Sequence, residues 1–267
     1  MTMDEIRKRI DSIDVRLVTL LNERTRLAVA VGRLKRRAGA DFYTPHREEV
    51  VLRQVLARTK GPLTEEAVRA IWREVMSAAL AAEKRLVIAY VGSEGSPAHE
   101  AARYKFGASL RYKSHPGMAS ICPAIESGQA DYGVVPMEQI KDGGRTHVSD
   151  LLRESELKIC AEIVRPSRHF VIGRQSAWRS GRDKTALLFT LANRVGALES
   201  ALALFRKCGI NLLTIESRPV TGDTGPCLFF IELRGHVEDR AVARALAELG
   251  RQSDLVTILG SYAEQDS

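Results

Sequence analysis

The feature that most constrains this chain is the stretch 3–38, which contains no proline and only one glycine, Gly32. Apolar residues recur there at intervals of alternately about three and four positions, which is the spacing of a heptad repeat. This spacing predicts one continuous helix. The seam positions are Ile6, Ile10, Ile13, Leu17, Leu20, Arg24, Leu27, Val31 and Leu34. A helix of about 35 residues is about 50 Å long, too long for one small domain to cover. The pattern therefore predicts a second copy of the helix as its cover.

Arg24 is the one polar residue of the seam, and two explanations fit it. In a plain coiled-coil dimer, a single polar seam residue fixes the register. Alternatively, Arg24 belongs to an anion site with Lys35, because eleven steps of about 100° return to within about 20° of the same helix face. Arg7 lies about 25 Å from Arg24 along the axis, so only an antiparallel partner crossing near position 18 can bring it to that spot. The spacing favours a dimer with two equivalent anion sites.

The charge distribution points to small anions. The net charge is +7, and residues 1–60 hold 14 Lys or Arg against 8 Asp or Glu. Such a basic region suits nucleic acid, a membrane surface or small anions. Aromatic side chains for base stacking are scarce here, and the arginines are interleaved with a packing seam, so we favour small anions over nucleic acid.

Length and cysteine usage set the outer limits. The 267 residues have room for two or three domains. There is no apolar run of membrane-spanning length, and the N-terminus is charged from Asp4 onward, so we expect a cytoplasmic protein without a membrane partner. The four cysteines are widely spaced and form no CxxC motif, so we expect thiols in a reducing compartment, with no metal site and no disulfide. They are Cys122, Cys160, Cys208 and Cys227.

Two further helices are predicted before residue 85. Thr44 is placed to cap a helix that begins at Pro45 and runs to about Arg58. Thr64 is placed to cap a third helix, which continues to Lys84. Together with the long first helix, they predict an all-α domain of three helices over residues 1–85.

The segment Tyr43-Thr44-Pro45-His46-Arg47-Glu48 and the cations of the first helix resemble the all-α chorismate mutases that lead bifunctional chorismate mutase–prephenate dehydratases. The resemblance covers nearly the whole chain and implies an intertwined dimer. It implies a substrate site formed by Arg7 of the neighbouring chain together with Arg24, Lys35, Arg47, Glu48 and Glu83. Two departures, Thr44 where the family often has Asp and Ala79 where it often has Ser, weaken the substrate contacts.

The resemblance also implies the reaction. Chorismate rearranges to prephenate by an intramolecular pericyclic shift, which needs neither a nucleophile nor a cofactor. The cations hold two carboxylates in a compact conformer, and negative charge that develops on the ether oxygen must be stabilised. Lys35 can donate a hydrogen bond to that oxygen, and Glu83 can do so only when protonated. We therefore assign catalysis to Arg24, Lys35 and Glu83, in the biosynthesis of phenylalanine and tyrosine.

After Lys84 the pattern changes to alternating strands and helices, which predicts a small α/β lobe with a parallel sheet over residues 86–175. The lobe resembles the first lobe of prephenate dehydratase in residues 92–96 and 133–138. The sequence departs from that family at Ser96-Pro97 and at Gln139-Ile140. It also runs almost directly into the next domain, where the family inserts a whole second lobe.

The junction admits two alignments. His169 fits the family's histidine segment before the second lobe, whereas Ser167-Arg168 fits the catalytic Thr-Arg segment after it. In either alignment the cleft has lost one wall, and acid-catalysed loss of water and CO₂ needs a closed, dry cleft. We therefore interpret the lobe as a remnant without dehydratase activity.

Residues 181–263 read as strand, helix, two strands, helix and strand, the βαββαβ order of a ferredoxin-like domain. They resemble the regulatory ACT domain of prephenate dehydratases, which implies phenylalanine as an effector. The residues that match its binding segments are Asn193, Gly196, Ala197, Leu198, Glu216, Ser217 and Arg218. The alternative is an ACT domain that serves only as a dimer interface and does not bind phenylalanine.

Two functions from different classes follow. The first is a chorismate mutase that is feedback-regulated by phenylalanine. The second is a non-catalytic phenylalanine-sensing dimer whose mutase site has decayed. A mutase that retains dehydratase activity is a variant of the first. The intact set of cationic residues favours the enzyme.

Overall fold

The computed structural model describes residues 2–37, 45–141, 144–165, 167–177, 179–220 and 226–264. The predicted cap Thr44 lies outside these ranges. The described chain forms two compact units. Among the described residues, the first unit comprises 2–37, 48–87 and 103–111, and the second comprises the others.

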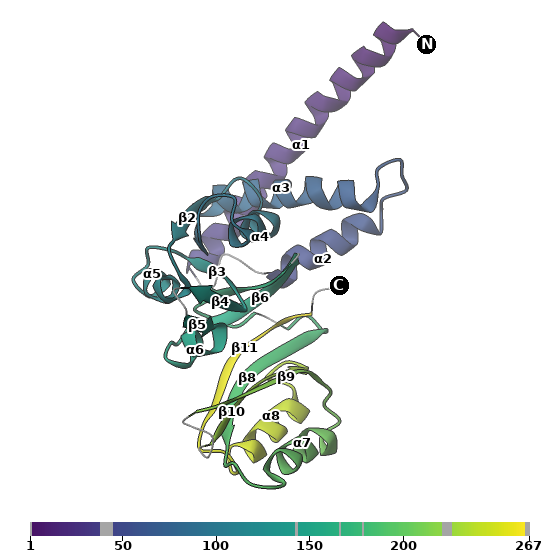
Figure 1. Ribbon diagram of the computed structural model, residues 1–267. Coiled ribbons are helices and arrows are strands. Elements are labelled where there is room, and N and C mark those ends of the chain that lie inside the picture. Colours follow the sequence, from purple (N-terminus) through teal and green to yellow (C-terminus); the bar gives the residue numbers. More distant parts are fainter. Residues whose placement is uncertain are drawn as a thin grey trace. The chain divides into compact units, whose positions relative to one another are not determined.

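Three helices open the chain, as predicted: α1 (Met3–Arg37), α2 (Pro45–Leu56) and α3 (Glu65–Glu83). Helix α1 runs as one unbroken rod of 35 residues (Figure 1). The predicted cap of α3 is confirmed, since the backbone N–H of Ala67 donates to Thr64 Oγ1 at 3.2 Å. None of the described helices is both long enough and apolar enough to cross a membrane.

The lobe that follows contains a five-stranded sheet in the order β2-β1-β3-β7-β6. Its strands are β1 (Val87–Val91), β2 (Arg111–His115), β3 (Tyr132–Pro136), β6 (Lys158–Arg165) and β7 (Ser167–Gly173). Its helical segments are α4 (Pro97–Phe106), the 3₁₀ turn η1 (Met118–Ser120), α5 (Ile121–Glu126) and α6 (Val148–Arg153). A short separate hairpin joins β4 (Glu138–Lys141) to β5 (Gly144–His147).

The prediction of a parallel sheet in this lobe was wrong for half of it. Strands β1 and β3 pair in parallel, but β7 pairs antiparallel with both β3 and β6. Strand β6 ends at Arg165 and β7 begins at Ser167. A connection this short permits only antiparallel pairing, because parallel neighbours need a crossover of a dozen or more residues. The sheet is therefore mixed.

The last part of the chain runs β8-α7-β9-β10-α8-β11, and its sheet has the order β11-β8-β10-β9. The strands are β8 (Asp183–Leu191), β9 (Leu212–Pro219), β10 (Cys227–Arg234) and β11 (Val256–Ala263). The helices α7 (Ala197–Lys207) and α8 (Arg240–Leu249) cover one face of this sheet (Figure 1). Alternate residues of β8 and β10 pack under them, including Leu187, Phe189, Phe229 and Ile231.

Candidate functional site

The geometry of the first site depends on how closely α3 approaches α1. Gly32 is the only residue that α1 buries within the described chain. It faces Glu83, the last residue of α3. The guanidinium of Arg36 lies 3.4 Å from the backbone oxygen of Glu83. The end of α3 is thus held against the last turns of α1.

Two predicted cations lie around this contact. Arg24 and Lys35 are both half-buried on α1, and the charge of each lowers the pKa of the Glu83 carboxyl. The structure therefore brings together the three residues to which the sequence assigns catalysis. Their eleven-residue spacing on α1 places the two cations on one helix face.

Glu83 carries an unsatisfied polar atom. Its Oε2 is buried, and no donor among the described residues makes a hydrogen bond to it. Burial raises the pKa of Glu83, and this effect exceeds the lowering by Lys35 and Arg24. The sequence alone did not decide between these opposing effects. A buried polar atom left without a protein partner is costly, so this oxygen is available to a ligand.

Three further predicted substrate residues, Arg7, Arg47 and Glu48, lie on α1 and in the first turn of α2. Arg7 is exposed, with 71% of its side chain accessible, and it lies 3.9 Å from Asp4. It stands 17 residues before Arg24 on the same rod, about 25 Å away, so within one chain it does not join the cluster. Arg47 is exposed and Glu48 is half-buried in the first turn of α2. Their place in the substrate site stays a prediction.

The apolar seam of α1 is exposed in the single chain. Ile10, Leu17, Leu20, Leu27 and Leu34 are each at least half accessible. A continuous exposed apolar stripe of this length marks an interaction surface.

Three of the predicted effector residues lie on β9, on two different faces of the second sheet. Glu216 pairs in register with Phe230, and Ser217 pairs with Phe229. Phe229 packs under the helices, so Ser217 shares their face while Glu216 and Arg218 point to the opposite one. Gly196, at φ +82°, caps α7 and is followed by Ala197 and Leu198. Asn193 is exposed in the loop before it.

Glu216 and Arg218 line a cavity of about 150 Å³ that also includes Arg145, His147 and Phe230. Arg218 forms an ion pair with Asp150 of α6. His147 Nε2 lies 3.4 Å from Glu216 Oε2 but makes no hydrogen bond with any residue that the structure describes. Burial, reinforced by Arg218, lowers the pKa of His147 to about 4, and burial together with Glu138 raises the pKa of Glu216. Sequence reasoning missed Arg145 and His147, because neither lies in a recognisable motif.

Arg168 forms ion pairs with two acidic residues. One alignment of the junction places Arg168 in the catalytic Thr-Arg segment of the dehydratases. Its guanidinium donates to Glu162 Oε2 and forms a second ion pair with Glu232. These carboxylates raise the pKa of Arg168 further above its usual range. Lys184 donates to the other oxygen of Glu162 at 2.7 Å. His169, the alternative candidate, is buried, and burial lowers its pKa.

Comparison with known proteins assigns the chain up to residue 185. The profile of chorismate mutase type II matches residues 6–84, and that of prephenate dehydratase matches residues 88–185. The bifunctional chorismate mutase/prephenate dehydratase of Aquifex aeolicus is 29% identical, over 97% of this chain and 97% of its own. The chain belongs to the bifunctional chorismate mutase/prephenate dehydratase family. Its first helical domain is a type II chorismate mutase.

Solved structures agree with this assignment. Prephenate dehydratase from Streptococcus mutans is 31% identical, with a TM-score of 0.55, over 66% of this chain and 97% of that one. Prephenate dehydratase from Arthrobacter aurescens, in complex with L-Phe, shares the fold at 21% identity and a TM-score of 0.58, over 68% of this chain and 92% of that one. The alignment with the Aquifex mutase/dehydratase runs over 352 residues, more than the 267 of this chain. Part of that relative therefore has no counterpart here.

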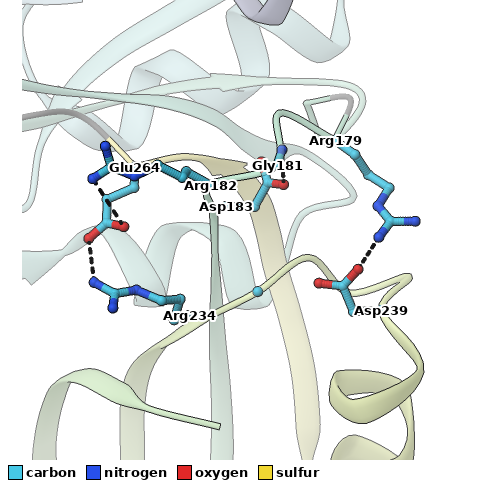
Figure 2. Close-up of a pocket in the computed structure, with 8 residues that line it drawn as sticks. Arg179, Gly181, Arg182, Asp183, Arg234, Asp239 and Glu264 are labelled. Atoms are coloured by element: carbon cyan, nitrogen blue, oxygen red, sulfur yellow. Dashed lines mark hydrogen bonds and ion pairs between the residues drawn. The ribbon is translucent and has the colours of Figure 1, made fainter.

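This mutase/dehydratase homologue has a further cavity, of about 320 Å³, where the segment before β8 meets the ends of β10 and β11 (Figure 2). Arg179 pairs with Asp239, and Arg182 and Arg234 both pair with Glu264. Asp183 accepts from the backbone N–H groups of Ser180 and Gly181. Three carboxylates thus balance three guanidiniums, so the cavity offers no net charge to a ligand.

Proposed function

We propose that this protein converts chorismate to prephenate at the cluster formed by Arg24, Lys35 and Glu83. The observation that carries the proposal is Glu83: the charges of Arg24 and Lys35 act on its carboxyl, and its buried Oε2 accepts no hydrogen bond from the described residues. Protonated, this carboxyl donates to the ether oxygen of chorismate as negative charge develops there. Lys35 donates to the same oxygen. No cofactor or metal takes part.

The site is completed by residues that bind the two carboxylates and the hydroxyl of the substrate. Arg24 and Arg47 bind carboxylates, and Glu48 accepts from the hydroxyl. Arg7 comes from a second copy of the chain. The exposed apolar seam of α1 supports this dimer, since an antiparallel partner crossing near position 18 both covers the seam and brings Arg7 to the site. Each homodimer then has two equivalent sites.

Dehydratase activity is lost in our proposal. Residues 86–175 correspond to a first dehydratase lobe, and the second lobe is the part of the relatives that this chain lacks. Arg168 supports the loss, because its guanidinium is neutralised by Glu162 and Glu232. It is therefore not available to bind the carboxylates of prephenate.

Phenylalanine is the proposed effector, and residues 181–263 form the ACT domain that binds it. The element order and the motif residues Asn193, Gly196, Ala197, Leu198, Glu216, Ser217 and Arg218 support this assignment. The fold is shared with a dehydratase crystallised with L-Phe. The mutase domain occupies residues 1–85, and the protein acts in the cytoplasm without nucleic-acid or membrane partners.

One assay separates this proposal from a non-catalytic phenylalanine-sensing dimer. Chorismate consumption is followed with the native protein and with Arg24→Ala, each with and without phenylalanine. We expect consumption by the native protein, its loss in the variant, and a change of rate with phenylalanine. Saturable phenylalanine binding without chorismate consumption would establish the sensor instead.

A further inference from the structure

Gly32 is an unusual residue for its position. It lies in the interior of α1, five residues before the helix ends. Glycine there disfavours a helix by about 1 kcal/mol relative to alanine. In a helix whose other described residues are all at least partly exposed, the one buried position is thus occupied by a helix-weakening residue. The reason has to lie in what Gly32 contacts.

The contact is Glu83. A β-carbon built on Gly32 would lie 3.1 Å from both Cβ and Cγ of Glu83 and 3.3 Å from its Oε2. These separations are shorter than ordinary van der Waals contacts, so any side chain at position 32 pushes Glu83 away by a few tenths of an ångström. The missing side chain lets the Glu83 carboxyl lie directly against α1, beside the cations of that helix.

We propose that Gly32 is a positioning residue for the mutase reaction: its lack of a side chain lets the Glu83 carboxyl lie against α1, the helix that carries Arg24 and Lys35. This inference rests on the proposed function of Glu83. Gly32 does not touch the substrate; it acts through the place it leaves for Glu83. Displacements well under 1 Å matter here, because misplacing a catalytic group by 1 Å can cost about 100-fold in rate.

The first test is Gly32→Ala, assayed for kcat and KM across pH. We expect kcat to fall about tenfold while KM changes less than about twofold, because the hydrogen bond from Glu83 matters chiefly in the transition state. Helix content by circular dichroism should not fall, since alanine favours the helix. An unchanged kcat would overturn the proposal.

A double-mutant cycle separates positioning from general packing. Adding Gly32→Ala to Glu83→Ala should change kcat by less than about twofold, because the group being positioned is already gone. If Gly32→Ala lowers kcat by the same factor in both backgrounds, it acts on the helix packing and the proposal fails.

A titration that needs no activity distinguishes failure of this inference from failure of the proposed function. Burial is the main cause of the raised pKa of Glu83, so pushing the carboxyl outward should lower that pKa toward its ordinary value. NMR titration of the Glu83 carboxyl carbon in the native protein and in Gly32→Ala measures this directly. Equal pKa values in the two proteins would refute the positioning role, whether or not the protein consumes chorismate.

Discussion

The guanidinium of Arg168 donates two hydrogen bonds, of 3.1 and 2.8 Å, to a single oxygen of Glu162. Glu162 is only 1% accessible, and Glu232, the second partner of Arg168, is fully buried. The hydroxyl of buried Tyr262 donates to Glu232 as well. This group of side chains links the α/β lobe to the βαββαβ sheet within the second unit, and Arg168 contacts a carboxylate on each side.

Arg168→Ala should lower the free energy of unfolding by about 3 kcal/mol, because it leaves two buried carboxylates with one cation fewer between them. Lys184 still pairs with Glu162 in this variant. The expected loss of unfolding free energy is therefore at the lower end of the range for breaking a buried ion pair. Arg251→Ala, which removes an exposed pair with Glu248, is the matched control and should cost less than about 1 kcal/mol. Urea denaturation measures both, and equal losses would show that the Arg168 cluster is not a stabilising contact.

The mutase should lose activity as pH rises through the pKa of Glu83. Only the protonated carboxyl donates a hydrogen bond, and burial raises this pKa, so the donor persists to a higher pH than for an ordinary glutamate. Glu83→Gln keeps a donor at every pH, so its profile should be flat and it should be the faster protein at alkaline pH. The measurement is kcat/KM for both from about pH 5 to 9. A flat native profile, or a Glu83→Gln protein inactive throughout, would remove Glu83 from the role of acid.

Incubation with prephenate at neutral pH should produce no phenylpyruvate above the spontaneous background. We expect this because, in our proposal, the chain lacks the segment that closes the dehydratase cleft, and because Arg168 is bound to carboxylates. Heat-denatured protein is the control for the spontaneous reaction. Phenylpyruvate formation that depends on native protein would show that the lobe is a working dehydratase.

Phenylalanine should bind saturably and change the mutase kinetics, with a coupling free energy of about 1–3 kcal/mol. Glu216→Ala removes a carboxylate of the proposed effector set. Gly196→Val forces a β-branched residue into a positive-φ conformation. Both should abolish binding, whereas Val195→Ala, at a fully exposed side chain, should preserve it. Calorimetric titration measures the binding, and retention of full affinity in Glu216→Ala would exclude that residue from the effector site.

Sequence patterns predicted the elements with strong local signals. Helix α3 followed from its capping residue Thr64, and the predicted βαββαβ order of residues 181–263 is observed as β8-α7-β9-β10-α8-β11. The convergence of Arg24, Lys35 and Glu83 was predicted through the family resemblance.

What the sequence did not predict depends on contacts between distant residues. Strand β7 is antiparallel because it follows β6 through a tight turn and pairs with β3. Neither contact produces a periodic pattern in the sequence. The Arg168–Glu232 ion pair joins positions 64 residues apart. The pKa of Glu83 was undecided because the competing effects of burial and charge need coordinates to be weighed.

The shared site is the central claim, and mixed dimers test it most directly. Arg7→Ala and Arg24→Ala are each expected to be inactive alone, because every site in either homodimer lacks one cation. In a heterodimer, one site receives both defects and the other receives none. An equal mixture after subunit exchange should therefore regain about a quarter of the native chorismate mutase activity. If mass spectrometry shows that heterodimers have formed and activity stays at the sum of the two inactive homodimers, Arg7 does not serve the neighbouring chain.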